Sequence, residues 1–192
     1  MVMCLPTLPD LSGTNLYLVG MMGAGKSTIA RQLADRLNYR SVDTDSLIEK
    51  CVGMTIPQFF DLEGESKFRE VEYQVLMQVA SFTRLVIATG GGVVVNQQNW
   101  LYLRDGIVVW LDVELETLFK RLQQSETVRP LLQTPQPWET LTKIYAQRRD
   151  FYAQADLRVE VGAEQSPGQV CDLLLEMLQA QVEVDRLKLR AN

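Results

Sequence analysis

The sequence predicts an α/β fold built on a parallel sheet, and two observations carry this prediction. Apolar segments with the length of strands alternate along the chain with segments whose apolar residues recur at helical spacing. This alternation is typical of parallel sheets whose strands are joined by helices. In addition, several polar and glycine-rich motifs directly follow strand-like segments, at the edge where open parallel sheets collect their ligands.

The expected elements follow from these two patterns. Five apolar segments are expected to form the strands, at residues 16–19, 41–43, 85–88, 107–112 and 157–161. Eight segments with helical periodicity are expected to form the helices, at residues 26–37, 45–51, 56–61, 65–81, 96–103, 114–124, 139–152 and 167–179. Ser166 and Pro167 mark the start of the last helix, because Ser is a preferred N-cap and Pro fits the first helical position.

Residues 20–27 match the pattern G-x-x-x-x-G-K-[ST] between the first expected strand and the first expected helix. In this arrangement, backbone N–H groups and the helix N-terminus can enclose a polyphosphate, and the glycines allow the close approach. Lys26 is then expected to reach the β- and γ-phosphates, and the Ser27 hydroxyl to bind Mg²⁺. The alternative is a chance match in an ordinary glycine turn. The flanking strand and helix favour a site for a nucleoside triphosphate.

Two carboxylates, Asp43 and Asp45, close the second expected strand. One of them is expected to hold Mg²⁺ through its water shell, and the other to contact an acceptor hydroxyl. Taken alone, aspartate at a strand end is as often a turn residue or a helix cap. The phosphate-binding loop beside it favours the functional interpretation.

An aromatic and basic segment follows at residues 59–69. Phe60, Phe68 and Arg69 are expected to form an apolar wall with a guanidinium fork for a small anionic substrate. Core packing is the alternative for one of Phe59 and Phe60, and a solvated helix charge is the alternative for Arg69.

Three glycines, Gly90, Gly91 and Gly92, follow the strand expected at 85–88. Three consecutive glycines lose much conformational entropy on folding. We therefore expect their backbone to approach a ligand closely, with a merely flexible loop as the alternative.

Residues 125–137 contain three prolines and little periodicity, which is typical of a lid. Arg129 in this segment is expected to close over the transferred phosphoryl group and neutralise its charge. Arg148 or Arg149, on the helix that follows, is expected to supply a second clamp on an acidic substrate.

Composition limits the classes of function. A chain of 192 residues with 46% hydrophobic residues is expected to form one domain. A net charge of −5 argues against a nucleic-acid partner, and the absence of His excludes a histidine base or ligand. Cys4, Cys51 and Cys171 are odd in number and widely spaced, which suggests free thiols. We found no signal peptide in residues 1–14 and no segment able to span a membrane, so a cytoplasmic protein is expected.

Together and in this order, the motifs resemble those of shikimate kinases over about residues 15–178. The resemblance implies a three-layer P-loop kinase fold with a five-stranded parallel sheet of order 2-3-1-4-5, flanked by helices, plus a lid. It implies a single domain, 1–192, with a substrate-binding subdomain at about 44–80. It further implies ATP as the phosphoryl donor, one Mg²⁺ per subunit, the 3-hydroxyl of shikimate as the acceptor, and a monomer.

The resemblance also assigns roles to residues. It implies catalytic roles for Lys26, Asp45 and Arg129, and a metal site at Ser27 and, through water, Asp43. The implied ATP-binding residues are Gly23, Ala24, Gly25, Lys26, Ser27, Thr28, Arg121, Arg129 and Gln165. The implied shikimate-binding residues are Asp45, Phe60, Phe68, Arg69, Gly90, Gly91, Gly92 and Arg148. Arg148 fits the second carboxylate-binding arginine better than the adjacent Arg149.

Two other functions remain open at this stage. Another small-molecule kinase of the same fold, such as a gluconate kinase, would lack the combined match at Arg69, the three glycines and Arg129. A domain that binds nucleotide without turnover would usually carry a damaged site, and these residues are all present. Residues 181–192 extend past the resemblance, as an edge strand, a helix extension or a tail, and are expected to be dispensable for catalysis.

Overall fold

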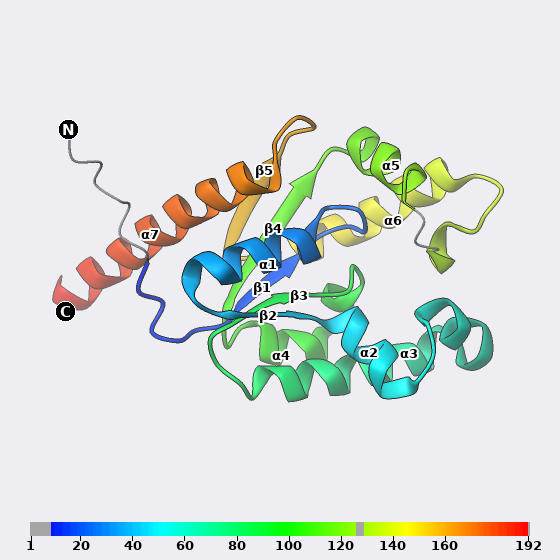
Figure 1. Cartoon of the computed structure of the whole chain (residues 1–192), viewed down its shortest axis with the longest axis horizontal. Helices are drawn as coiled ribbons and strands as arrows, with labels where there is room; N and C mark the ends of the chain where they lie inside the picture. The colour runs from blue at the N-terminus through cyan, green and yellow to red at the C-terminus, as the bar shows by residue number, and fades with distance from the viewer. Residues whose placement is uncertain (1–8, 126–128, 192) are drawn as a thin grey trace.

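The computed structural model describes residues 9–125 and 129–191. Its centre is one parallel sheet of five strands in the order β2-β3-β1-β4-β5, as the sequence predicts (Figure 1). The strands are β1 (Leu16–Val19), β2 (Arg40–Asp43), β3 (Leu85–Ala88), β4 (Ile107–Val113) and β5 (Leu157–Val161). The strand ends lie within one residue of those expected.

Helices join these strands and cover both faces of the sheet. The α-helices are α1 (Lys26–Leu37), α2 (Thr44–Val52), α3 (Ile56–Ala80), α4 (Trp100–Leu103), α5 (Leu115–Gln123), α6 (Pro137–Tyr152) and α7 (Pro167–Ala191). Three short 3₁₀ helices are η1 (Val93–Val95), η2 (Gln97–Asn99) and η3 (Pro130–Leu132). Neither η1 nor η3 was expected from the sequence, because three residues give no periodicity to detect, whereas η2 falls within the helix expected at 96–103.

Two expected helices, 56–61 and 65–81, are joined in α3 across a kink. Gly64 at the kink has φ 79° and ψ 171°, outside the helical region. Only glycine adopts such a backbone readily, so the bend is encoded locally. Thr55 starts α3 with a capping box, in which Thr55 and Gln58 satisfy each other's backbone N–H groups. The helix expected at 96–103 is instead the 3₁₀ turn η2 followed by the single turn of α4.

The extension at 181–191 is helical. It continues α7 to Ala191, so of the three alternatives the helix extension is correct. At its other end α7 begins as expected: the Ser166 hydroxyl accepts a hydrogen bond from the Gln169 N–H at 3.3 Å, and Pro167 is the first helical residue. The far end of α7 lies on the side of the molecule away from the carboxyl ends of the strands (Figure 1).

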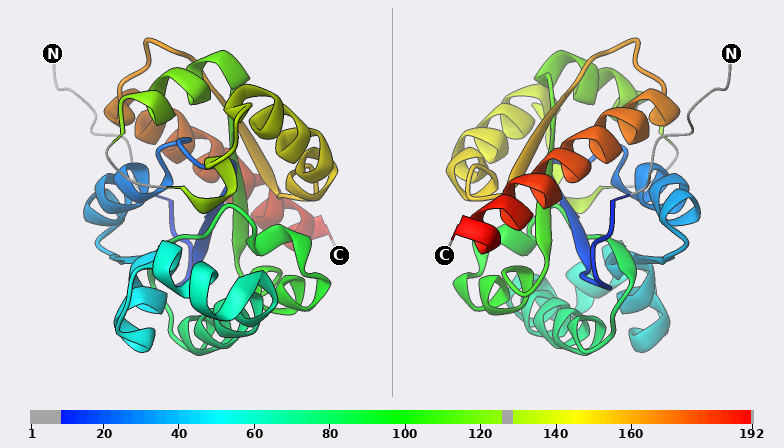
Figure 2. Two further views of the ribbon diagram at one scale, coloured as in Figure 1. Left: turned by 90° about the vertical axis from the view of Figure 1, so that its right-hand side faces the viewer. Right: turned by 90° about the vertical axis from the view of Figure 1, so that its left-hand side faces the viewer.

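The core lies on both faces of the sheet. All residues of β1 and β3 are buried, as is typical of parallel strands covered by helices on both sides. Helix α1 packs against β1, β2 and β3 and against α7, while α3 packs against α2 and α4 (Figure 2). Among the described residues, no helix is long and apolar enough to cross a membrane.

The parallel direction of the strands brings distant motifs to one edge. The phosphate-binding loop follows β1, Asp43 ends β2, and the three glycines come just after β3. Helix α2, the bent part of α3 and the segment before α6 surround this edge (Figures 1 and 2). The fold therefore assembles a site from segments that are far apart in the sequence.

Candidate active site

A cavity of about 450 Å³ opens at this edge, and a second of about 280 Å³ adjoins it over the phosphate-binding loop. Gly23, Gly25, Thr28 and Arg121 line both cavities. Ala24 and Gln165 line only the second. The other predicted site residues line the first cavity: Lys26, Ser27, Asp43, Asp45, Phe60, Phe68, Arg69, Gly90, Gly91, Gly92, Arg129 and Arg148. All residues predicted from the sequence are thus brought to two neighbouring cavities.

The phosphate-binding loop is shaped by glycine. Gly20, Gly23 and Gly25 have φ values of 139°, 81° and 91°, in the region that other residues rarely adopt. At Gly20 a Cβ would also lie 2.6 Å from the carbonyl oxygen of Leu111 on β4, so no side chain fits there. The loop ends at the N-terminus of α1, whose first residue is Lys26.

Lys26 is buried and folds back on its own loop. Its Nζ donates to the carbonyl oxygens of Gly20 at 2.8 Å and Met21 at 2.9 Å. Burial lowers the pKa of Lys26 to about 8, because the charged form loses hydration, and this outweighs the attraction of Asp45. The two carbonyl oxygens carry only partial negative charge. An anion bound in the cavity would therefore be a stronger partner for the Lys26 ammonium.

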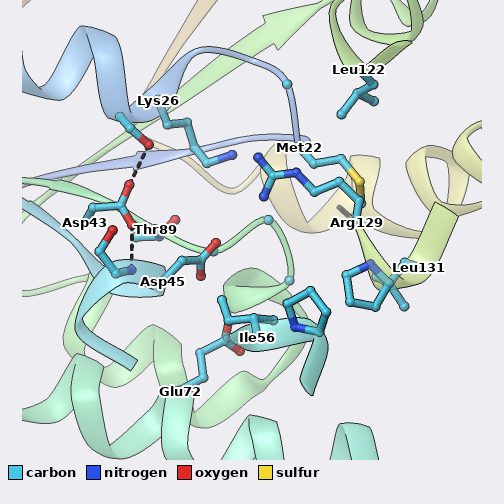
Figure 3. A pocket seen from close by; sticks show the side chains of 18 of the residues that line it. Met22, Lys26, Asp43, Asp45, Ile56, Glu72, Thr89, Leu122, Arg129 and Leu131 are labelled. Carbon is cyan, nitrogen blue, oxygen red and sulfur yellow. Dashed lines mark hydrogen bonds between the residues drawn. The ribbon is translucent and has the colours of Figure 1, made fainter. Parts of the chain in front are cut away.

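Ser27 and Asp43 meet beside Lys26. The Ser27 hydroxyl donates to Asp43 Oδ2 at 2.5 Å, and Asp43 Oδ1 accepts from the N–H of Ser46 at 3.1 Å (Figure 3). Asp43 is thus also the N-cap of α2, so the helix-cap alternative is correct, and the same side chain lines the cavity.

The Ser27 hydroxyl and the Asp43 carboxylate are chemically suited to bind Mg²⁺. A hydroxyl and a carboxylate are hard oxygen ligands, and Mg²⁺ is usually bound by one or two such groups plus substrate phosphates. Among the side chains that the structure describes, no group of three His, Cys, Asp or Glu could hold a metal ion without such help. The donors present suit a metal that arrives with a nucleotide.

Asp45 lies in the first turn of α2 and faces the cavity with Lys26 and Arg129 (Figure 3). Burial and the nearby charge of Asp43 raise the pKa of Asp45, while Lys26 and Arg129 act in the opposite direction. The carboxylate is therefore poorly hydrated and close to cations, a setting typical of a catalytic base.

At two of the three glycines after β3, a side chain would collide with charged groups of the site. A Cβ on Gly90 would lie 2.8 Å from both Asp45 Oδ1 and Glu72 Oε1. A Cβ on Gly92 would lie 2.4 Å from Arg69 Nη1 and 2.5 Å from Nη2. None of the three glycines has a positive φ, so it is space and not backbone freedom that favours glycine at 90 and 92. A Cβ on Gly91 would meet its nearest neighbour at 3.4 Å.

Replacing Gly92 by Ala should therefore push the Arg69 guanidinium out of position. We expect the KM for an acidic acceptor to rise about tenfold or more, with the KM for the nucleotide nearly unchanged, since the atoms nearest to a Cβ on Gly92 all belong to Arg69. Steady-state kinetics with each substrate varied in turn measure this split. Gly168→Ala is the matched control, because a Cβ there meets its nearest neighbour at an ordinary 3.6 Å. Equal effects of the two changes would contradict this interpretation.

Arg69 is held by two carboxylates on its own helix. Nη1 donates to Glu72 Oε2 and Nη2 donates to Glu65 Oε1, both at 2.8 Å. The guanidinium lies 5.2 Å from the centre of the Phe68 ring, which in turn packs 4.7 Å from the ring of Phe60. Phe59 is buried and also packs on Phe68, so of the two adjacent phenylalanines Phe59 belongs to the core and Phe60 lines the cavity.

Glu72 is a charged residue of the site that was not predicted from the sequence. Its side chain is 1% exposed, and Oε1 has no hydrogen-bond partner among the described residues. Burial raises the pKa of Glu72, opposed by the neighbouring charge of Arg69. The spacing Arg69-x-x-Glu72 was the available signal, since residues three apart on a helix are neighbours.

Three further arginines border the first cavity. Arg148 is buried and donates from Nη1 to the Gly91 carbonyl oxygen at 3.1 Å, whereas Arg149 is exposed. Of these two neighbours, only Arg148 lines the cavity. Arg129 and Arg121 line the cavity from the segment before α6 and from the last turn of α5. Of the expected lid, residues 126–128 lie outside the described residues, and Arg129, Pro130 and Leu131 line the cavity.

Comparison with known proteins adds independent findings. A protein-family model described as "Shikimate kinase" matches residues 22–179. A shikimate kinase of Synechococcus elongatus is 51% identical over 168 residues, covering 88% of both chains. That of Thermosynechococcus vestitus is 52% identical over 168 residues, covering 88% of this chain and 91% of its own.

Solved structures agree with these relatives. A shikimate kinase from Acinetobacter baumannii, in complex with shikimate, superposes with a TM-score of 0.82 at 37% identity, covering 90% of this chain and 95% of its own. A gluconokinase from Sinorhizobium meliloti gives a TM-score of 0.59 at 13% identity over 92% of this chain and 97% of its own, a likeness of fold alone.

Proposed function

The chain belongs to the shikimate kinase family, and from the geometry of its cavities we propose how its residues carry out the family's reaction. That reaction transfers the γ-phosphoryl group of ATP to the 3-hydroxyl of shikimate and gives shikimate 3-phosphate and ADP. One observation supports this function best. A single cavity is lined by the cations Lys26, Arg69, Arg129 and Arg148, and Asp45 also faces it.

The nucleotide half of the site follows from the phosphate-binding loop. The loop amides and Lys26 hold the phosphates, with Lys26 exchanging its carbonyl partners for phosphate oxygens. Ala24, Arg121 and Gln165 bound the second cavity, which takes the rest of the nucleotide. Ser27 and, through water, Asp43 would hold Mg²⁺, which would supply positive charge to neutralise the phosphates.

The acceptor half follows from the arginines and the buried carboxylates. Arg69 and Arg148 bind the carboxylate of shikimate, and Phe60 and Phe68 form the apolar wall against its ring. Asp45 accepts the proton of the 3-hydroxyl as that oxygen attacks the γ-phosphorus. Arg129 and Lys26 neutralise charge on the phosphoryl group during transfer. The site needs no histidine, because this chemistry depends on positioning and on charge neutralisation.

ADP release coupled to a second enzyme tests the assignment. With Mg²⁺ and ATP present, we expect rapid ADP release when shikimate is added. ADP release should be slow with gluconate or with no acceptor. A clear rate on gluconate and none on shikimate would contradict the proposal. Nucleotide binding without release on either compound would favour a non-catalytic domain.

A further inference from the structure

Tyr152, at the end of α6, is a fully buried residue to which the reaction as described assigns no role. Its ring stacks on Trp110 of β4 with 5.9 Å between ring centres. Its hydroxyl donates to the carbonyl oxygen of Gly91 at 2.5 Å, and the sulfur of Met21 in the phosphate-binding loop lies 3.7 Å away. Tyr152 therefore joins the loop after β3 to the loop after β1.

The ring and the hydroxyl of Tyr152 have separable purposes. A phenylalanine would fill the same space and stack on Trp110 equally well. A buried hydroxyl loses hydration and is tolerated only where a hydrogen bond compensates for this. Burial raises the pKa of Tyr152 to about 12, so the hydroxyl keeps its proton at neutral pH and acts as a donor.

The bond to Gly91 fixes the direction of a peptide group. The Gly91–Gly92 peptide is trans, so its C=O and the N–H of Gly92 point in opposite directions. Holding the carbonyl oxygen toward Tyr152 and Arg148 therefore turns the Gly92 N–H toward the opposite side. Glycine backbone has little intrinsic preference that would hold this peptide without such bonds.

Gly92 lies against the guanidinium of Arg69, since a Cβ on it would come within 2.4 Å of Nη1. A carboxylate bound to Arg69 is thus beside the Gly92 backbone. Resting on the function proposed above, we infer that Tyr152 is a positioning residue: its hydroxyl orients the Gly91–Gly92 peptide so that the Gly92 N–H helps to bind the acceptor's carboxylate. Tyr152 itself touches no substrate in this arrangement.

Tyr152→Phe tests the inference, since it removes the hydroxyl and keeps the ring. We expect the KM for shikimate to rise about five- to twentyfold and the KM for ATP to stay within twofold. As a competitive inhibitor, the reduced analogue of shikimate, with CH₂OH in place of the carboxylate, should bind parent and variant equally. Tyr73→Phe is the matched control: its hydroxyl pairs with that of Tyr102 at 3.2 Å, outside both cavities, and its loss should leave both KM values unchanged.

If Tyr152 had a purely structural role, Tyr152→Phe would lower the melting temperature without changing either KM, and that result would overturn the inference. So would equal losses of affinity for shikimate and its reduced analogue. If Tyr152→Phe does not fold, 4-aminophenylalanine at position 152 keeps a donor in the same place. The inference then requires parent-like KM values, and a raised KM for shikimate would contradict it. A parent enzyme inactive on shikimate would instead refute the proposed function, so the two failures are distinguishable.

Discussion

Asp45→Asn should lower kcat by about 10²- to 10⁴-fold, the range typical of losing a general base. Asparagine keeps the shape of the side chain but cannot accept the proton of the attacking hydroxyl. The KM for ATP should change little, because Lys26, Ser27 and the loop amides remain. Single-turnover kinetics and calorimetric binding of the ATP analogue AMP-PNP measure the two effects separately.

The pH profile gives a second view of the same residue. A base works only when deprotonated, so kcat should fall as the pH drops through the pKa of Asp45. Because burial raises that pKa, the fall should occur at higher pH than for an ordinary aspartate. Asp61→Asn, at an exposed position on α3, is the control and should keep the parent's rate. A rate within threefold of the parent for Asp45→Asn would show that Asp45 is not the base.

Arg69→Lys should raise the KM for shikimate by about 30- to 100-fold, which corresponds to about 2–3 kcal/mol. Lysine keeps the charge but loses the planar fork that now binds Glu65 and Glu72 at 2.8 Å each. One ammonium cannot keep Glu72 paired and also grip a substrate carboxylate with two parallel bonds. The KM for ATP should stay within about twofold.

Arg149→Lys is the matched control for this change. Arg149 is exposed on α6, next to the buried Arg148, and its replacement should leave both KM values unchanged. Circular dichroism and a melting curve show whether Arg69→Lys remains folded with Glu72 buried beside it. An increase in the KM for ATP with that for shikimate unchanged would assign Arg69 to the nucleotide.

The parallel sheet and its motifs could be predicted because their signals are local. Strand β1, the glycine loop and α1 form a continuous segment, and the sequence shows their order and most of their ends. The sequence indicated a break near Gly64 but not that the two helices beside it form one bent helix, α3. Whether two such segments join depends on tertiary packing. The extension of α7 could not be decided, because alternating apolar and charged residues fit both a strand and a helix.

The contacts that complete the site are long-range and leave little trace in a single sequence. The sequence suggested that Gly90 and Gly92 approach a ligand, whereas the structure adds contacts with Asp45, Glu72 and Arg69. Likewise, the bond from Tyr152 to Gly91 joins residues 61 positions apart, and no spacing rule points to it. The residue types of the site were predictable, but the contacts that hold them in position were not.

The central claim is that this cavity directs the γ-phosphoryl group to one hydroxyl of shikimate. Proton–phosphorus NMR of the product tests it most directly, because coupling identifies the carbon that carries the phosphate. We expect one product, with phosphorus coupled to the proton at C3, formed in equal amount with ADP. Phosphate on another hydroxyl, or ADP formed with free phosphate and unchanged shikimate, would contradict it.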